Sequence, residues 1–161
     1  MEKTASLPWS DRFSVGDRSM DSTHQEFLGL LAAAESAEDA CFSSCLAQLH
    51  RHTEQHFAEE DRQMQASGFP SAQCHLAEHA AVLASVRGVL ELVRQGQTAK
   101  GRDLCRALAN WFPEHTQAMD MGVATWLLKQ RTGGAPLTFV RNAAAATAGD
   151  GQTTGRAVRS Q

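Results

Sequence analysis

Apolar residues recur at intervals of three and four along most of the chain, and no stretch alternates apolar and polar residues as a half-buried strand does. This pattern predicts four amphipathic helices, over about residues 20–35, 39–66, 72–95 and 98–129. Glycines or prolines follow the second, third and fourth segments and act as stop signals. Because the connections are short, consecutive helices should be antiparallel neighbours, and the chain is predicted to be an all-α, up-down-up-down four-helix bundle.

The two ends of the chain lie outside this pattern. Residues 1–19 contain Trp9, Phe13 and Val15 but have no helical period, so we expect an N-terminal arm that packs across the bundle. Beyond about Gly133 the sequence becomes rich in Ala, Gly, Thr and Ser and has too few apolar residues to offset the entropy of ordering. The prediction is one domain over residues 1–132, followed by a flexible, disordered C-terminal tail over 133–161.

Composition narrows the range of partners. The 161 residues carry a formal net charge of only −3, which favours neither nucleic acid nor an acidic membrane surface as a partner. No apolar run approaches the roughly 20 residues that cross a bilayer, and the start is a poor signal peptide. We therefore expect a cytoplasmic protein, monomeric by default, with the tail as the place for any protein partner. The four cysteines form no CxxC pair, and we interpret them as small buried hydrophobic residues.

The histidines raise the question of a metal, since the chain has seven of them and no tyrosine. His75 and His79 are four residues apart, so both leave the same face of the third predicted helix. The same spacing separates His56 from Glu60 in the second. In each helix this face is the apolar one. The side chains of metal-ligand type that the pattern directs into the core are His24, His56, Glu60, His75, His79 and His115.

Buried imidazoles and carboxylates are costly unless something pairs with them, and a cation would do so. A single histidine on an apolar stripe is usually a hydrogen-bonded core residue, but four helices that each direct ligand groups inward make a purely structural role a poor explanation. Imidazole and carboxylate without thiolate suit iron or zinc, and manganese less well. With Asp120 the set has seven groups, which is too many for one ion and suits two.

Several segments together resemble the bacterial hemerythrins over about residues 9–130. They are Asp21-Ser22-Thr23-His24, His56-Phe57-Ala58-Glu59-Glu60, Gly68-Phe69-Pro70, the pair His75 and His79, and Trp111-Phe112-Pro113-Glu114-His115 followed by Asp120. The order of the HFxxE, HxxxH and HxxxxD elements makes this resemblance specific.

The resemblance implies a ligand set and a function. One iron would take His75, His79 and His115, and the other would take His24 and His56 and keep a position open for O2. Glu60 and Asp120 would bridge the two iron ions together with an oxo or hydroxo group. The expected function is a non-haem diiron protein that binds oxygen reversibly as a carrier, store or sensor, and not an enzyme. The alternatives are a diiron enzyme acting on peroxide or nitric oxide, and a signalling or interaction module.

One spacing conflicts with a regular helix. His115 and Asp120 are five residues apart, which places them about 140° apart around an α-helix, so they cannot share a face. We therefore predict a π-type widening between them, with Pro113 just upstream removing one helix hydrogen bond.

Three polar residues near the expected ligands have other interpretations. His52 also forms an HxxxH pair with His56; we favour His56 as the ligand and interpret His52 as a core-edge residue or a hydrogen-bond donor near the site. His50 is expected to be exposed. Asp21 is a candidate N-cap of the first helix.

Overall fold

The computed structural model describes residues 7–134, in which all regular secondary structure is helical and no strand occurs. The elements, in chain order, are η1 (Asp11–Phe13), α1 (Arg18–Ser36), α2 (Asp39–Ser67), α3 (Ala72–Arg94), α4 (Thr98–His115), η2 (Thr116–Asp120) and α5 (Met121–Thr132). The predicted helices are confirmed to within three residues at each end.

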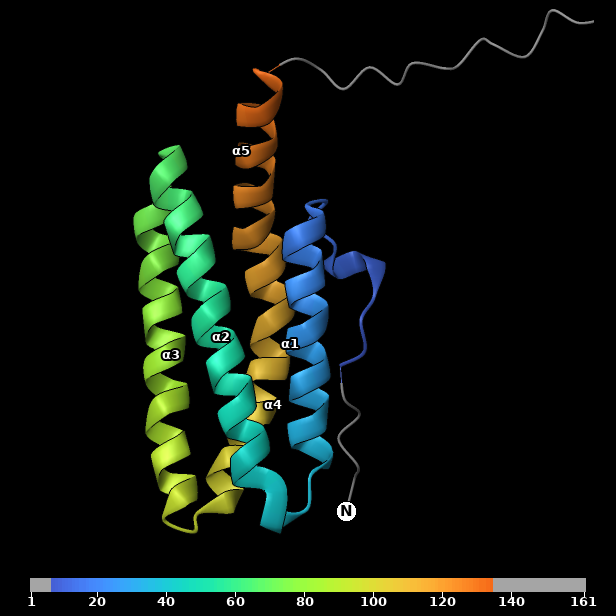
Figure 1. Ribbon diagram of the computed structural model, residues 1–161, viewed down its shortest axis with the longest axis vertical. Helices are drawn as coiled ribbons and strands as arrows, with labels where there is room; N and C mark the ends of the chain where they lie inside the picture. Colours follow the sequence, from blue (N-terminus) through green and yellow to red (C-terminus); the bar gives the residue numbers. More distant parts are fainter. Residues whose placement is uncertain (1–6, 135–161) are drawn as a thin grey trace, which may run out of the picture.

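The helices form the predicted up-down-up-down bundle, in which consecutive helices pack side by side and α4 closes the bundle against α1 (Figure 1). The segments α4, η2 and α5 follow one another as one long helix, and α5 extends beyond the ends of α2 and α3 (Figure 1). Gly68 and Gly133 end α2 and α5 with positive φ angles of 65° and 60°, as the stop signals indicated. No helix among residues 7–134 is long and apolar enough to cross a membrane.

The described part of the N-terminal arm packs on the bundle as predicted, since Phe13 is fully buried and contacts the ring of Phe112. The prediction for Asp21 is wrong. Asp17 is the N-cap of α1 and accepts from two backbone amides, while Asp21 accepts from the Ser14 hydroxyl at 2.6 Å and the Val15 amide at 2.7 Å. Asp21 therefore ties the arm to α1, because the chain turns back over the first turn of the helix.

The core has two apolar clusters with a polar layer between them. The larger cluster lies toward the α1–α2 and α3–α4 connections and includes Phe27, Phe42, Leu46, Leu90 and Leu104. The smaller one lies toward the opposite end and consists of Val15, Met20, Met64, Val123 and Ala124. Along each helix the buried histidines and carboxylates come between residues of these clusters.

The interpretation of the cysteines as buried is wrong for two of the four. Cys41 and Cys74 are exposed, because each lies near the start of its helix on the face away from the core. Cys105 is buried in the larger apolar cluster, and Cys45 packs against it. The tail predicted over 133–161 lies outside the described residues from residue 135 onward.

Candidate metal centre

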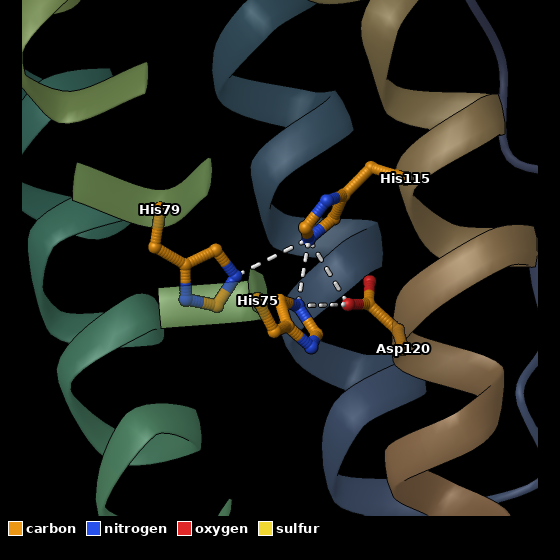
Figure 2. Close-up of side chains that lie close together, drawn as sticks. All are labelled: His75, His79, His115 and Asp120. Atoms are coloured by element: carbon orange, nitrogen blue, oxygen red, sulfur yellow. Dashed lines mark hydrogen bonds and ion pairs between the residues drawn. The ribbon is translucent and has the colours of Figure 1, made fainter. Parts of the chain in front are cut away.

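Three histidines and one carboxylate meet between α3 and the long helix α4–η2–α5. The Nε2 atom of His115 lies 3.2 Å from the Nε2 atoms of both His75 and His79, and 3.0 Å from Oδ1 of Asp120. Figure 2 shows the three rings and the carboxylate directed toward one another. The four ligand-type atoms all lie within 4.8 Å of one another, which is the spacing of groups that could hold one cation.

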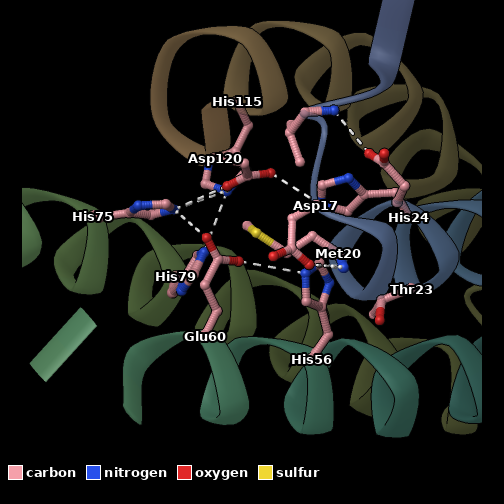
Figure 3. A network of polar contacts seen from close by, with 12 residues as sticks. Asp17, Met20, Thr23, His24, His56, Glu60, His75, His79, His115 and Asp120 are labelled. Carbon is pink, nitrogen blue, oxygen red and sulfur yellow. Dashed lines mark hydrogen bonds and ion pairs between the residues drawn. The ribbon is translucent and has the colours of Figure 1, made fainter. Parts of the chain in front are cut away.

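A second group comes from α1 and α2. Nε2 of His56 lies 3.4 Å from Oε2 of Glu60, one turn along the same helix. Across the bundle, Nε2 of His24 lies 3.1 Å from Oδ2 of Asp120. The rings of His24 and His56 are 5.2 Å apart between centroids. These two histidines thus face the first group from the other side of the two carboxylates (Figure 3).

Each carboxylate divides its two oxygens between the two groups. Asp120 presents Oδ1 to His75, at 3.2 Å, and to His115, and presents Oδ2 to His24. Glu60 presents Oε1 to His75 at 3.7 Å and Oε2 to His56. Both carboxylates therefore stand between a three-histidine group and a two-histidine group (Figure 3).

The irregular turn predicted between His115 and Asp120 is confirmed. Residues Thr116–Asp120 form a π-helical turn, in which the amide of Met121 bonds to the carbonyl of Thr116, five residues earlier. The wider turn places both ends of the five-residue interval on the inner face, and Asp120 is fully buried. Pro113 lies inside α4 just before this turn. Without the π turn, Asp120 would point away from His115.

The centre contains buried polar atoms that the described residues do not satisfy. Neither oxygen of Glu60 or Asp120, nor either ring nitrogen of His24, has a hydrogen bond of acceptable geometry, although imidazole nitrogens lie close by. An unsatisfied buried polar group costs about 1–3 kcal/mol. Cations coordinated by these oxygens and nitrogens would satisfy them, and the donor set of imidazoles and carboxylates suits a transition metal such as iron or zinc.

Asp120 stays ionised in the centre, and two of the neighbouring histidines differ in their tendency to take up a proton. Burial opposes ionisation of Asp120, but close contacts with His115, His24 and His75 outweigh it and hold its pKa well below the ordinary value. Burial likewise opposes a charge on His115, yet the contacts with Asp120 and Glu78 raise its pKa. Burial, helped by the neighbouring His75 and His115, lowers the pKa of His79 to about 2, so its imidazole is neutral, as a metal ligand must be.

Aromatic rings enclose the histidines. Phe57 stacks on His79 at 3.7 Å between centroids, and Trp111 stacks on His115 at 4.3 Å. Phe112 packs edge-on against His24 at 5.4 Å and stacks on Phe27. The four aromatic side chains Phe27, Phe57, Trp111 and Phe112 therefore form a shell around the histidines.

The seven predicted side chains are brought together by these contacts, with His56 the most exposed of them at 9% of its side chain. His52 is not directed into the centre. Its Nε2 lies 3.1 Å from the Thr23 carbonyl and its Nδ1 3.7 Å from Glu26, so both nitrogens face α1. The prediction that His50 is exposed is wrong: only 13% of its side chain is accessible, because it packs along α2 beside Glu54.

Two carboxylates beside the centre were not predicted. Nδ1 of His79 lies 2.7 Å from Oδ1 of Asp61, and Nδ1 of His115 lies 3.2 Å from Oε1 of Glu78. Both carboxylates are about one third exposed and lie outside the apolar stripes of their helices. Their positions directly after Glu60 and directly before His79 were the only sequence signal.

Comparisons with known proteins agree with this geometry. Residues 15–127 match the family model described as hemerythrin HHE cation binding domain. A bacteriohemerythrin of Ralstonia nicotianae is 40% identical over 124 residues, which cover 77% of this chain and 90% of that protein. Myohemerythrins of Riftia pachyptila and Sipunculus nudus are each 26% identical over 70% of this chain and 86% of their own. The family match and the 40% identity both extend over most of the chain, and the fold and the buried histidines and carboxylates agree with them. This chain therefore belongs to the hemerythrin family.

Proposed function

We propose that this protein binds two iron ions between its four helices and uses them to bind O2 reversibly, as a carrier, store or sensor. The observation that carries the proposal is the division of the Asp120 and Glu60 oxygens between two groups of histidines. A carboxylate placed in this way suits a bridge between two cations, because each oxygen can coordinate a different ion. A centre for one ion would not need both carboxylates in this position.

The proposed ligands follow the two groups. His75, His79 and His115 would hold one iron, and His24 and His56 the other, with Glu60 and Asp120 shared between them and an oxo or hydroxo group completing the bridge. The bound irons would supply the electrons that O2 takes up on binding and returns on release. The open position would lie on the two-histidine side, which has fewer protein ligands and contains His56, the most exposed of the seven.

The chain's own contribution is to orient the ligands and exclude water. The stacked rings of Phe57 and Trp111 restrict the imidazoles that they cover, and Phe27 and Phe112 close the core beside His24. An apolar enclosure slows the entry of water and protons that would displace bound oxygen. These properties favour reversible binding, and we propose no enzymatic turnover.

The proposal is tested on the purified protein. Iron per chain should approach two, and the optical spectrum of the reduced protein should gain a band on exposure to O2 that disappears on degassing. His56→Asn should lower the iron content and abolish the reversible band, because it removes one of two histidines from that side. His50→Asn is the matched control, since His50 lies on the same helix and contacts Glu54 outside the centre.

Three results would overturn the proposal. The first is a protein that binds zinc and no iron. The second is iron content and a reversible band that survive His56→Asn unchanged. The third is irreversible oxidation on exposure to O2 accompanied by turnover of peroxide or nitric oxide, which would favour the enzymatic alternative.

A further inference from the structure

Two histidines of the three-histidine group have a carboxylate on their outer nitrogen. His79 on α3 meets Asp61 on α2, with Nδ1 2.7 Å from Oδ1. His115 on α4 meets Glu78 on α3, with Nδ1 3.2 Å from Oε1. The same Oε1 atom of Glu78 accepts from the indole N–H of Trp111 at 2.8 Å, and Trp111 stacks on His115.

These contacts determine which nitrogen of each ring carries the proton. An ionised carboxylate can only accept a hydrogen bond, so Nδ1 of His79 and of His115 must donate. In a neutral imidazole the other nitrogen then presents a lone pair. That nitrogen is Nε2, and the Nε2 atoms of these two rings lie 3.2 Å apart at the centre. When both rings are neutral, the carboxylates thus place their protons on Nδ1 and direct Nε2 toward the centre, as a cation requires.

The remaining buried histidines have no such support. Nδ1 of His75 and Nδ1 of His24 have no hydrogen-bond partner among residues 7–134. His24 belongs to the two-histidine group, so the support from carboxylates is concentrated on the opposite side of the centre. Hydrogen bonding from Nδ1–H to a carboxylate makes Nε2 a stronger electron donor. The two sides of the centre are therefore unequal in donor strength as well as in number of histidines.

We infer that Asp61 and Glu78 are positioning residues of the metal centre: they fix the tautomer and orientation of His79 and His115 and strengthen the three-histidine side as a ligand for ferric iron. This inference rests on the proposed diiron function. It concerns two partly exposed side chains outside the proposed ligand set, and it explains why each has its carboxylate directed toward a buried ring.

The test uses iron-loaded protein and paired variants. Asp61→Ala and Glu78→Ala remove the acceptors, and Asp61→Asn and Glu78→Gln keep an oxygen acceptor without the charge. The matched controls are Glu59→Ala, which removes an exposed carboxylate bonded to Arg62 and Gln63 on α2, and Glu114→Ala, which removes an exposed carboxylate next to His115. Iron affinity is measured by competition with a chelator, and the reduction potential of the centre by optical redox titration.

The alanine variants should lose iron affinity by about 10- to 100-fold, the usual effect of removing a partner of a metal-bound histidine. Their reduction potentials should shift to more positive values, because a weaker donor stabilises the ferric state less. The Asn and Gln variants should recover most of the affinity but keep part of the shift in potential. Both controls should match the wild type.

The result separates this inference from the proposed function. If the wild type binds two irons and O2 reversibly, but the four variants have the same iron affinity and potential as the controls, the positioning role is wrong and the diiron function stands. A loss of affinity with no change in potential would also overturn it, since packing alone would explain that. If the wild type itself holds no iron, the proposed function has failed first.

Discussion

The large apolar cluster and the polar layer above it are equally buried, but they are stabilised in different ways. Phe42, Leu46 and Leu49 have no accessible surface and need only each other and their neighbours. His24 and Asp120 are also fully buried, yet their polar atoms lack satisfactory partners within the described chain. The first region is complete as a packed core, whereas the second is complete only with a cation of suitable charge and geometry.

This difference shows where folding and function are in conflict. Burying an apolar side chain stabilises the fold by about 1.5–3 kcal/mol, while a buried carboxylate without a partner destabilises it. One bundle holds both because the apolar clusters at its two ends support the polar layer between them. It follows that stability and metal binding should respond differently to changes in the two regions.

Removal of iron should have the largest effect on stability. A ligand present at 1,000 times its dissociation constant stabilises the folded state by about 4 kcal/mol, and iron coordinated by seven side chains should contribute at least this much. Chemical denaturation with and without a chelator measures the difference under anaerobic conditions. His56→Asn provides the control, because its stability should depend less on the chelator. Equal unfolding free energies for the loaded and metal-free wild type would show that the polar layer is stable by itself.

Leu46→Ala should give the next largest effect and act on stability alone. It leaves a cavity in the larger apolar cluster, and such substitutions cost about 2–5 kcal/mol. Iron per chain and the reversible oxygen band should stay unchanged, because Leu46 lies nearly three turns before His56 on α2. Leu128→Ala is the control at an exposed leucine and should change stability by less than about 0.5 kcal/mol. Loss of the oxygen band in Leu46→Ala would mean that the two regions are coupled.

Most of the helical framework could be predicted because periodicity records burial directly. The strongest case is η2, where the resemblance implied that His115 and Asp120 both face inward, although a five-residue interval is incompatible with this in an α-helix. A regular α-helix could not direct both side chains inward, and this conflict predicted the π turn between them. For His24 and His56 the apolar period alone predicted inner faces, where the structure has them.

Interactions between helices could not be predicted in the same way. Asp61 and Glu78 lie at the edges of their helices, where a carboxylate is ordinarily a solvated surface group. Whether such a residue meets a buried histidine depends on the rotation and spacing of neighbouring helices, which periodicity leaves undetermined. The exchange of roles between Asp17 and Asp21 has a similar origin: both suit a helix start, and the path of the arm decides which one caps α1.

The smallest expected effect on stability is at Asp17. Unlike the polar groups of the metal centre, this carboxylate has all its partners within the chain. It caps α1 through the amides of Ser19 and Met20, and it accepts from Arg131 of α5 at 2.7 Å. Burial opposes its ionisation, but the hydrogen bonds from Arg131 and Met20 outweigh burial and lower its pKa below the ordinary 3.8. The ionised form is therefore favoured by folding. Its contribution is present above about pH 4 and is lost as pH falls through the lowered pKa.

Asp17→Asn keeps a capping side chain and removes only the charge, so it should lower the unfolding free energy at pH 7 by no more than about 1 kcal/mol, since Arg131 is largely exposed and the pair is screened. The difference from wild type should shrink toward zero as the pH falls to 2, because the wild-type carboxyl is then protonated too. Comparing both proteins by denaturation at each pH cancels the loss of iron common to them. Asp103→Asn, which removes an exposed aspartate paired with Arg106 and caps no helix, is the matched control and should lower the unfolding free energy at pH 7 by less than Asp17→Asn. A difference between Asp17→Asn and wild type that stays constant over this range would mean that charge at Asp17 contributes nothing.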